Sequence, residues 1–364
     1  MTADATSAQF VREAHHIVRD LFAANPRRYW VDFLMTMLVV YTAFAVYIVA
    51  PWFSVAQAGA FVICGLAMFR AMVFTHEINH QRGAAFGPFT FVWNVLCGIP
   101  FLMPSFLYGD HKDHHTNSAY GTWSDPEYLR RTAGWRLRVF AFLLLPILYP
   151  ILVAVRFLFV TPLALLFRRM DRLAWTCGSS LYVMNESYRR EYDAAASARS
   201  RWIQEVACCA WAWLVASLAT MGYMPLSAVA KTYLVFLFWI SLNQVRTLVA
   251  HRYTNDADAP VSYLYQLLDT NTFPRGRWLP ELWAPVGLRY HALHHLLPTL
   301  PYHAMGEAHA RLMHELPPGS PYHQTVKSGL WPVLISTVLD RKQEMPLQHA
   351  GASATMLEDR QDSQ

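Results

Sequence analysis

The sequence predicts an all-α integral membrane protein, in which four transmembrane helices are arranged as two hairpins and the histidine-rich segments lie on the cytoplasmic side. Three observations lead to this fold class. The composition is strongly apolar, and four separate stretches are long and apolar enough to cross a bilayer. Most arginines and all histidines lie outside those stretches, as expected if they belong to aqueous regions between the helices.

The composition excludes an ordinary soluble domain. The 364 residues are 54% hydrophobic and only 15% charged, which is typical of a membrane protein. The formal net charge of +5 comes mostly from arginine. Because membrane proteins collect arginine in cytoplasmic loops for topological reasons, we expect no nucleic-acid partner. The five cysteines form no C-x-x-C pair, so neither a disulfide framework nor an iron–sulfur site is expected.

Four apolar stretches reach the roughly 20 residues that a helix needs to cross the hydrocarbon. They cover about residues 29–53, 55–74, 202–221 and 226–250. The first stretch is too long for a signal-peptide core, so we expect it to remain as an anchor. The short links within the two hairpins carry no charge, whereas segments 1–28 and 75–201 are rich in arginine. The positive-inside rule therefore places both termini and the middle segment in the cytoplasm.

Two further apolar stretches contain residues that a spanning helix avoids. Prolines and a glycine interrupt 89–107, and three prolines with Arg156 interrupt 139–167. We expect in-plane or re-entrant helices there, although a second short hairpin within 139–167 remains open. One extra crossing would carry the later histidines to the opposite face, so only zero or two extra crossings fit. The membrane domain should cover 29–330, and the ends of the chain, 1–8 and about 343–364, are expected to lack regular structure.

The histidines are the most informative residues in the sequence. Eight of the sixteen fall into three groups just outside apolar stretches, and a ninth ends the fourth stretch. The groups have the spacings H-x-x-x-H, H-x-x-H-H and H-x-x-H-H. The nine residues are His76, His80, His111, His114, His115, His251, His291, His294 and His295. Residues three and four apart lie on one face of a helix, so each group offers two or three imidazoles to one point, as metal ligands do.

Three such groups in one chain predict a metal centre more strongly than any one of them. A single H-x-x-x-H pair often arises by chance. The four-span topology, however, brings all three groups and His251 to the same side of the membrane, within 75–201 and 251–330. His251 alone carries less information, because a lone histidine at the end of a span is often an interfacial residue. The seven other histidines are scattered and receive no ligand role.

These motifs resemble the membrane fatty acid desaturase superfamily, in particular its bacterial branch. The resemblance covers about residues 30–330 and extends to three runs beside the histidine groups. These runs are WNVLCGIP, YGTWSDPEYL and GLRYHALHHLLPTLPYHAMGEAH. The resemblance implies a cytoplasmic cap over a four-helix stem, two non-haem iron ions held almost wholly by histidine, and a place in the bacterial inner membrane.

The resemblance also implies an oxidoreductase that uses O2 and two external electrons to attack an unactivated C–H bond. A ferredoxin, a rubredoxin or a cytochrome b5-like protein is the implied electron donor, because the chain itself has no motif for a haem or an iron–sulfur domain. We expect a fatty acyl lipid as the substrate and an alkene as the product. Hydroxylation remains open, as does desaturation of a small amino-acid-derived metabolite such as dihydrorhizobitoxine, because the outcome depends on where the substrate carbons lie.

One position departs from stearoyl-type members, which place an asparagine four residues before the histidine that ends the last span. Thr247 stands there in this sequence. Asn243 lies about 80 degrees around the helix from His251 at 100 degrees per residue, so it is not assigned as a ligand and the tenth position stays open. Five acids beside the histidines are candidates for orienting the imidazole N–H groups, or equally for solvated loop charges. They are Glu77, Asp110, Asp113, Asp125 and Glu127.

A membrane zinc protease is the alternative from another class of enzyme. His76, Glu77 and His80 also satisfy H-E-x-x-H, with Glu77 as the general base. That interpretation leaves both H-x-x-H-H groups unexplained, and Asp269 is followed by Thr270 rather than by the glycine of an L-D-G motif. A haem-binding electron carrier would need single histidines within the spans. Metal analysis of the purified protein would distinguish the three.

Overall fold

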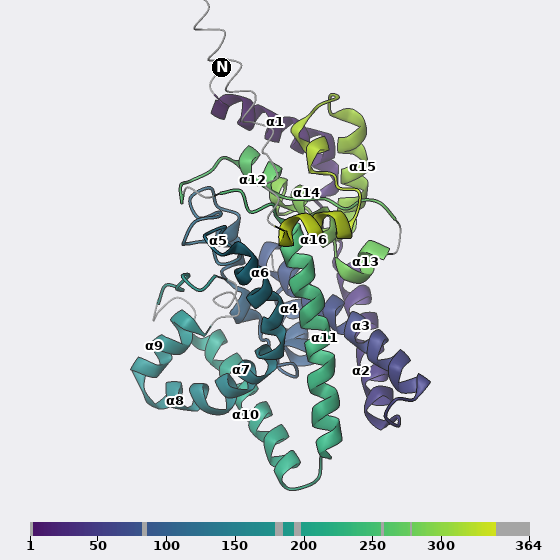
Figure 1. Cartoon of the computed structure of the whole chain (residues 1–364), viewed down its shortest axis with the longest axis vertical. Coiled ribbons are helices and arrows are strands. Elements are labelled where there is room, and N and C mark those ends of the chain that lie inside the picture. Colours follow the sequence, from purple (N-terminus) through teal and green to yellow (C-terminus); the bar gives the residue numbers. More distant parts are fainter. Residues whose placement is uncertain are drawn as a thin grey trace, which may run out of the picture.

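The computed structural model describes residues 3–81, 86–178, 185–192, 198–255, 258–276 and 279–339. Within these ranges the chain is helical, and strand-like pairing is limited to two isolated bridges, between His251 and Thr270 and between Thr272 and Val326. Long helices extend from one side of a group of short helices (Figure 1). The long helices are called the stem below, and the short helices above them the cap. The predicted all-α fold is confirmed.

The stem consists of two helical hairpins. The first pairs α2 (Pro26–Val49) with α3 (Val55–His80), and the second pairs α10 (Ala198–Thr220) with α11 (Leu226–Ala250). Each helix of the first hairpin begins at a side-chain cap: Asn25 accepts a hydrogen bond from the backbone of Arg28, and Ser54 accepts one from Gln57. The starts and ends of all four agree with the predicted stretches to within a few residues, apart from the extension of α3 to His80.

Close packing between α3 and α11 joins the two hairpins. A Cβ atom added at Gly65 would overlap the ring of Phe238 on α11, so the absence of a side chain at this position lets the helices approach. The buried face of α2, with Phe33 and Met37, packs in the same apolar cluster as residues of α3 and α11. The apolar side chains of the stem that point outward are extensively exposed, as expected for helices surrounded by lipid.

In the part of the chain that the structure describes, five helical segments, rather than four, are long and apolar enough to cross a membrane. The additional one is Tyr149–Leu166, which lies in the stretch that the sequence analysis assigned to broken helices. The chain there forms α7 (Tyr149–Val155), a π-helical turn (Arg156–Val160) and α8 (Thr161–Leu166). Figure 1 shows α8 lying crosswise to α11 rather than beside it. By length and composition alone the count of four is therefore not confirmed.

Most of the remaining short helices lie around the upper end of the stem, whereas α9 lies beside α8 (Figure 1). Their bounds are α1 (Ala3–Val18), α4 (Phe86–Trp93), α5 (His111–His114), α6 (Trp135–Leu144), α9 (Arg168–Cys177), α12 (Tyr263–Asp269), α13 (Leu279–Trp283), α14 (His291–Leu296), α15 (Met305–Glu315) and α16 (Leu330–Val338). Ala14 and Val18 of α1 are fully buried in an apolar cluster with α15. The expected lack of structure at 1–8 is therefore wrong for residues 3–8, because α1 buries an apolar face; segment 343–364 lies outside the described residues.

Candidate metal centre

Four separate elements bring the nine predicted histidines to one place at the junction of stem and cap. The last turns of α3 carry His76 and His80, and α5 with the residue after it carries the second group. His251 follows α11 directly, and α14 carries the third group. All nine side chains are buried, with at most 8% of any residue exposed. The convergence that the four-span topology predicted is present in the structure.

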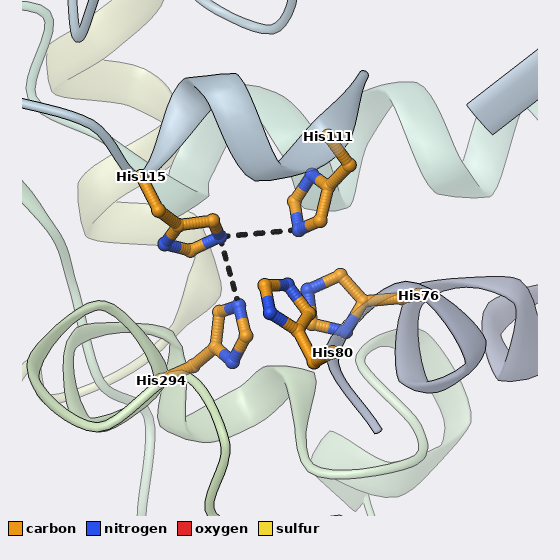
Figure 2. A group of neighbouring side chains, drawn as sticks. All are labelled: His76, His80, His111, His115 and His294. Carbon is orange, nitrogen blue, oxygen red and sulfur yellow. Dashed lines mark hydrogen bonds between the residues drawn. The ribbon is translucent and has the colours of Figure 1, made fainter. Parts of the chain in front are cut away.

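The nine histidines divide into two sets, and the ligating nitrogens within each set lie within 4.8 Å of one another. The first set, shown in Figure 2, holds five residues whose rings point toward a common centre: His76, His80, His111, His115 and His294. The second set holds His114, His251, His291 and His295. Each H-x-x-H-H group thus supplies both sets. Histidines four residues apart, such as His111 and His115, belong to the same set. The histidine three residues after the first of a group, such as His114, belongs to the other set.

The spacing of the Nε2 atoms fits a shared metal ion better than direct contact between the rings. Nε2 of His115 lies 3.2 Å from that of His111 and 3.0 Å from that of His294. In the second set, Nε2 of His291 lies 3.0 Å from that of His251. Two nitrogens about 2.1 Å from one metal and at right angles to each other are about 3.0 Å apart. Nε2 of His76 and of His114 has no protein hydrogen-bond partner, as expected for ligand atoms.

Burial favours the neutral, metal-binding form of most of these imidazoles, whereas the carboxylates near His114, Asp125 above all, outweigh its burial and raise its pKa. Burial lowers the pKa of His251, His291 and His295 well below 6.5, and the neighbouring histidines lower it further. The same causes lower the pKa of His115 and His294. A neutral imidazole has one nitrogen lone pair available, so these five histidines offer metal ligands at neutral pH without first releasing protons. Whether each histidine binds metal stays a prediction.

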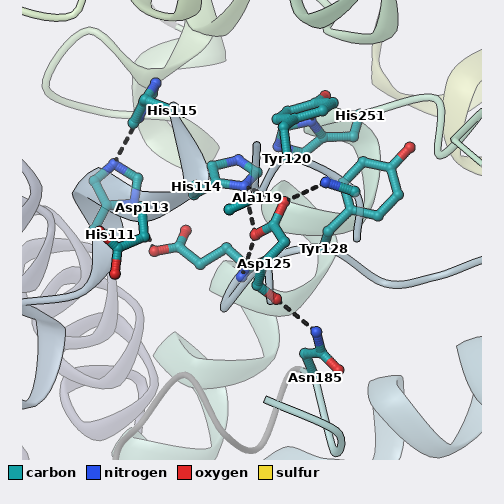
Figure 3. A network of polar contacts seen from close by, with 12 residues as sticks. His111, Asp113, His114, His115, Ala119, Tyr120, Asp125, Tyr128, Asn185 and His251 are labelled. Atoms are coloured by element: carbon teal, nitrogen blue, oxygen red, sulfur yellow. Dashed lines mark hydrogen bonds and ion pairs between the residues drawn. The ribbon is translucent and has the colours of Figure 1, made fainter. Parts of the chain in front are cut away.

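Carboxylates orient two of these rings through the nitrogen that faces away from the centre. Nδ1 of His111 lies 2.5 Å from Glu127 Oε1, and Nδ1 of His114 lies 2.8 Å from Asp125 Oδ1 (Figure 3). Burial raises the pKa of Glu127, but the adjacent His111 outweighs burial and brings that pKa below its usual value. An ionised carboxylate at this position holds the proton on Nδ1 and leaves Nε2 free to bind metal.

A tyrosine and an aspartate that sequence reasoning missed orient His251. The phenol oxygen of Tyr120 lies 2.9 Å from His251 Nδ1 and donates to Asp269 Oδ2 at 2.8 Å. Burial raises the pKa of Tyr120 well above its usual value, so the phenol keeps its proton and accepts the Nδ1–H of His251. Asp269 is fully buried and accepts further bonds from Tyr128 and Thr254. No spacing in the sequence linked Asp269 to the histidines.

The other predicted acids form no hydrogen bond with a histidine ring among the described residues, although Glu77 Oε1 lies 3.9 Å from His76 Nδ1. Glu77 accepts hydrogen bonds from the Tyr29 hydroxyl at 2.6 Å and from the Tyr302 backbone N–H at 3.2 Å. Its carboxylate therefore joins α2 to the cap, which does not support the protease interpretation with Glu77 as general base. Asp110 pairs with Arg190, and Asp113 has no hydrogen bond to a histidine among the described residues.

The two residues considered for the tenth position, Thr247 and Asn243, both lie beside the histidines. Thr247 is buried on the wall of the cavity beside the histidines. Asn243 also lines that cavity, and its Oδ1 accepts a hydrogen bond from Arg246 at 3.0 Å. The structure therefore engages Asn243 with a neighbouring side chain, in agreement with its angular separation from His251.

Comparison with known proteins now identifies the group to which the chain belongs. The model of the family described as fatty acid desaturase matches residues 50–326, which contain all nine histidines. The chain belongs to the fatty acid desaturase family. It is an oxidoreductase of this family, and the resemblance recognised in the sequence is confirmed.

One curated relative of this desaturase-family protein covers almost the whole chain. It is a ceramide hydroxylase of Caulobacter vibrioides (strain NA1000 / CB15N), which is 38% identical over 336 residues, or 92% of this chain and 94% of the relative. The family thus includes a close homologue named for hydroxylation. A C–H oxidation of the desaturase or hydroxylase type follows for this chain, but the family alone does not decide between the two outcomes.

A cavity of about 130 Å³ adjoins the first histidine set. It lies between α3 and α11, and His76, Glu127 and Arg246 line it together with apolar residues such as Met72 and Ile240. The cavity is similar in size to an engineered cavity of about 150 Å³ that holds benzene. It can therefore accept a short part of a lipid beside the candidate metal centre, but not a whole lipid.

Proposed function

We propose that this protein is an O2-dependent hydroxylase that acts on the acyl part of a lipid of the ceramide class, with two iron ions held by the nine histidines. The observation that carries the substrate and the reaction is the ceramide hydroxylase that aligns with 92% of the chain. The cavity beside His76 supports it, because a substrate bound there has its carbons next to the first histidine set.

The donor set supports iron as the metal. Both sets consist of imidazoles alone, and imidazole suits iron, copper, nickel and zinc. A structural zinc site takes four ligands, whereas the first set offers five nitrogens, which favours a metal with a larger coordination number. When bound, a pair of irons with neutral ligands supplies an oxidant strong enough for an alkyl C–H bond. The protein orients three of the nine rings, those of His114, His111 and His251, through Asp125, Glu127 and Tyr120.

The proposed reaction takes R–H, O2, two electrons and two protons to R–OH and water. One oxygen atom enters the substrate and the other leaves as water. The two electrons must come from an external donor, and a ferredoxin, a rubredoxin or a cytochrome b5-like protein remains the expected class. The burial of all nine histidines excludes bulk water from the centre and so limits side reactions.

Desaturation is the second candidate, because the family model carries that description. The alkene predicted from the sequence would arise if the substrate lost a second hydrogen from the adjacent carbon, with two waters as the other products. About 1.4 kcal/mol of difference between the two barriers shifts their ratio tenfold. The name of the relative favours an alcohol as the product, and we therefore propose hydroxylation. The alkene product predicted from the sequence stays a prediction.

Labelled oxygen distinguishes the two reactions. Purified protein with a reducing system and a ceramide should, under ¹⁸O2, form a product that carries one heavy oxygen. If the product is an unlabelled alkene, the reaction is desaturation rather than hydroxylation, and the proposed metal centre is unaffected. Absence of any O2-dependent product from ceramides, fatty acids and other lipids would contradict the proposed function as a whole.

Histidine variants test the metal centre separately. Replacing His294 by alanine in the first set, or His114 in the second, should lower the bound iron and abolish activity, with membrane insertion unchanged because hydropathy determines the spans. His314 is exposed on α15 and provides a matched control, whose replacement by alanine should leave the iron unchanged. Full iron and activity in either of the first two variants would remove that residue from the centre.

We also propose that four helices cross the membrane, with the metal centre on the cytoplasmic side of a bacterial inner membrane. Because His115 and His251 meet at one centre, the chain between them crosses an even number of times. Three candidate spans lie between them: Tyr149–Leu166, Arg199–Thr220 and Leu226–Ala250. The first is best placed in the interface, since its π-helical turn contains Arg156, which pairs with Glu205 at 2.6 Å. The arginine-rich middle segment supports the cytoplasmic side; reporters at residues 222 and 364 that read the same side would contradict this topology.

A further inference from the structure

The cavity beside His76 contains buried hydrogen-bond donors that nothing in the described part of the chain satisfies. They are the indole N–H of Trp239, Nε–H of Arg246 and the hydroxyl of Thr75. Trp239 is 4% exposed and Arg246 is 9% exposed. A buried polar group without a partner costs about 1–3 kcal/mol, and native structures keep few of them. Three around one cavity therefore indicate a ligand that supplies acceptors.

The donors are arranged on two facing walls of the cavity. Trp239, Asn243 and Arg246 lie at positions i, i+4 and i+7 of α11 and so share one face of that helix. The first and last of them are about 10 Å apart along the axis at 1.5 Å per residue. Thr75, directly before His76, belongs to α3. A polar group bound between these walls lies beside the first histidine set.

The charge of Arg246 strengthens this argument. Within the described residues, no carboxylate forms an ion pair with its guanidinium, and its one side-chain hydrogen bond goes to the neutral Asn243 at 3.0 Å. Glu127, the carboxylate on the cavity wall, is bonded to His111 and to the Tyr108 hydroxyl instead. Glu127 is close enough to interact electrostatically with Arg246 but forms no ion pair with it, so an oxygen-bearing ligand would satisfy the guanidinium N–H that stays buried without a partner.

The opposite end of the cavity is apolar. A smaller cavity of about 30 Å³ continues from it and shares Met103, Tyr149, Trp239 and Ile240 with it. The residues that line only this second cavity are all apolar and include Phe101 and Phe236. The lining therefore changes from polar near His76 to apolar farther along α11, which matches a molecule with a polar end and an alkyl chain.

We propose that Trp239, Arg246 and Thr75 bind the oxygen atoms at the carbonyl end of the substrate, so that oxidation occurs at a carbon only a few bonds from that carbonyl. This inference rests on the proposed function and adds the substrate feature that enters the site, namely the carbonyl end of an acyl lipid rather than the middle of its chain. The alkyl chain then extends through the smaller cavity. An amide and a carboxylate both present such a carbonyl oxygen, and the substrates tested below separate them.

The test compares substrates that differ only at the carbonyl. Full-length iron-loaded protein in lipid nanodiscs is supplied with a ceramide, with the free fatty acid of the same acyl chain, and with the alkane of the same length, and the oxidised carbon is located by mass spectrometry. We expect oxidation next to the carbonyl end and little turnover of the alkane. The better of the two carbonyl substrates identifies whether an amide or a carboxylate is bound.

Two matched tryptophan variants test the donor itself. Trp239→Phe removes the indole N–H and keeps an aromatic ring, and it should raise KM about 5- to 30-fold and spread the product over several carbons. Trp213→Phe removes an indole N–H that donates to Leu158 O at 3.1 Å on the exposed side of α10, and it should change neither value. Thr75→Val provides a second cavity variant of almost unchanged volume.

Binding without oxygen separates this inference from the proposed function. Under anaerobic conditions the dissociation constant for a ceramide should be about 5- to 30-fold higher for Trp239→Phe than for the unchanged protein, whatever reaction follows. A carbonyl labelled with ¹³C should also show an infrared shift that this variant loses. Equal binding by both proteins, equal oxidation of the alkane, or oxidation at mid-chain would overturn the carbonyl site while leaving lipid hydroxylation in place.

Discussion

Replacement of Tyr120 by phenylalanine should remove iron from the second histidine set, whereas the same replacement at Tyr128 should not. Both phenols are fully buried, and both donate to Asp269 Oδ2 at 2.8 Å. Each variant therefore loses one hydrogen bond to a buried carboxylate, which is worth about 1.5–3 kcal/mol of the free energy of unfolding. The Tyr128 ring packs edge-on against His251, but of the two phenols only that of Tyr120 forms a hydrogen bond with a histidine, at 2.9 Å from His251 Nδ1.

The difference between the two variants isolates the orientation of His251. Loss of a partner that orients a metal-binding histidine typically weakens metal binding 10- to 100-fold, or about 1.4–2.7 kcal/mol. The assay is iron content by mass spectrometry during titration with a chelator, together with thermal unfolding of each purified protein. We expect similar losses of thermal stability and a selective loss of iron in Tyr120→Phe. Equal iron retention by the two variants, or equal loss, would refute the role assigned to Tyr120.

Two further predictions concern packing and pH. Gly65→Ala should lower the free energy of unfolding by about 1–3 kcal/mol, because the added methyl overlaps Phe238, whereas Gly59→Ala on the same helix meets nothing within 4 Å and should be neutral or stabilising in a thermal unfolding assay. Burial lowers the pKa of His309 from 6.5 to about 4, so below pH 6.5 the unfolded chain binds a proton that the folded chain does not, and stability falls as the pH drops toward 4. His309→Gln should remove up to about 3 kcal/mol of this pH dependence, and parallel stability curves for the two proteins would contradict it.

The sequence alone was enough to predict the class of the fold and the nine histidines that converge in the structure. Hydropathy along the chain is a local property, so the four long stretches could be located without any contact between them. Histidine spacing within a helix is local as well, since residues three or four apart necessarily share a face. The limit of this reasoning is residues 149–166, where the sequence predicted broken helices and the structure has a helical segment of spanning length. Length and apolarity are shared by spanning and interfacial helices, so they do not decide whether this stretch crosses the membrane.

The division of the histidines into two sets was decided by the tertiary structure, although its cause lies in helix geometry. At 100 degrees per residue, residues four apart differ by about 40 degrees and residues three apart by about 60 degrees in the opposite sense. His115 therefore turns with His111 to one side of α5, and His114 turns to the other. Which side faces which centre depends on where α3, α11 and α14 lie, and the spacing of one helix carries no information on that.

The groups that orient the rings and line the cavity depended wholly on tertiary structure. Tyr120 reaches His251 across 131 residues, and the pair meets Asp269 only because the segment after α12 folds back beside the end of α11. Trp239 is one of thirteen tryptophans, and its unpaired indole N–H becomes visible only when its surroundings are packed. Local periodicity places residues on faces of single helices. Which polar atom on such a face has a partner is determined by the helices that pack against it, because the hydrogen bond requires both groups within about 3 Å.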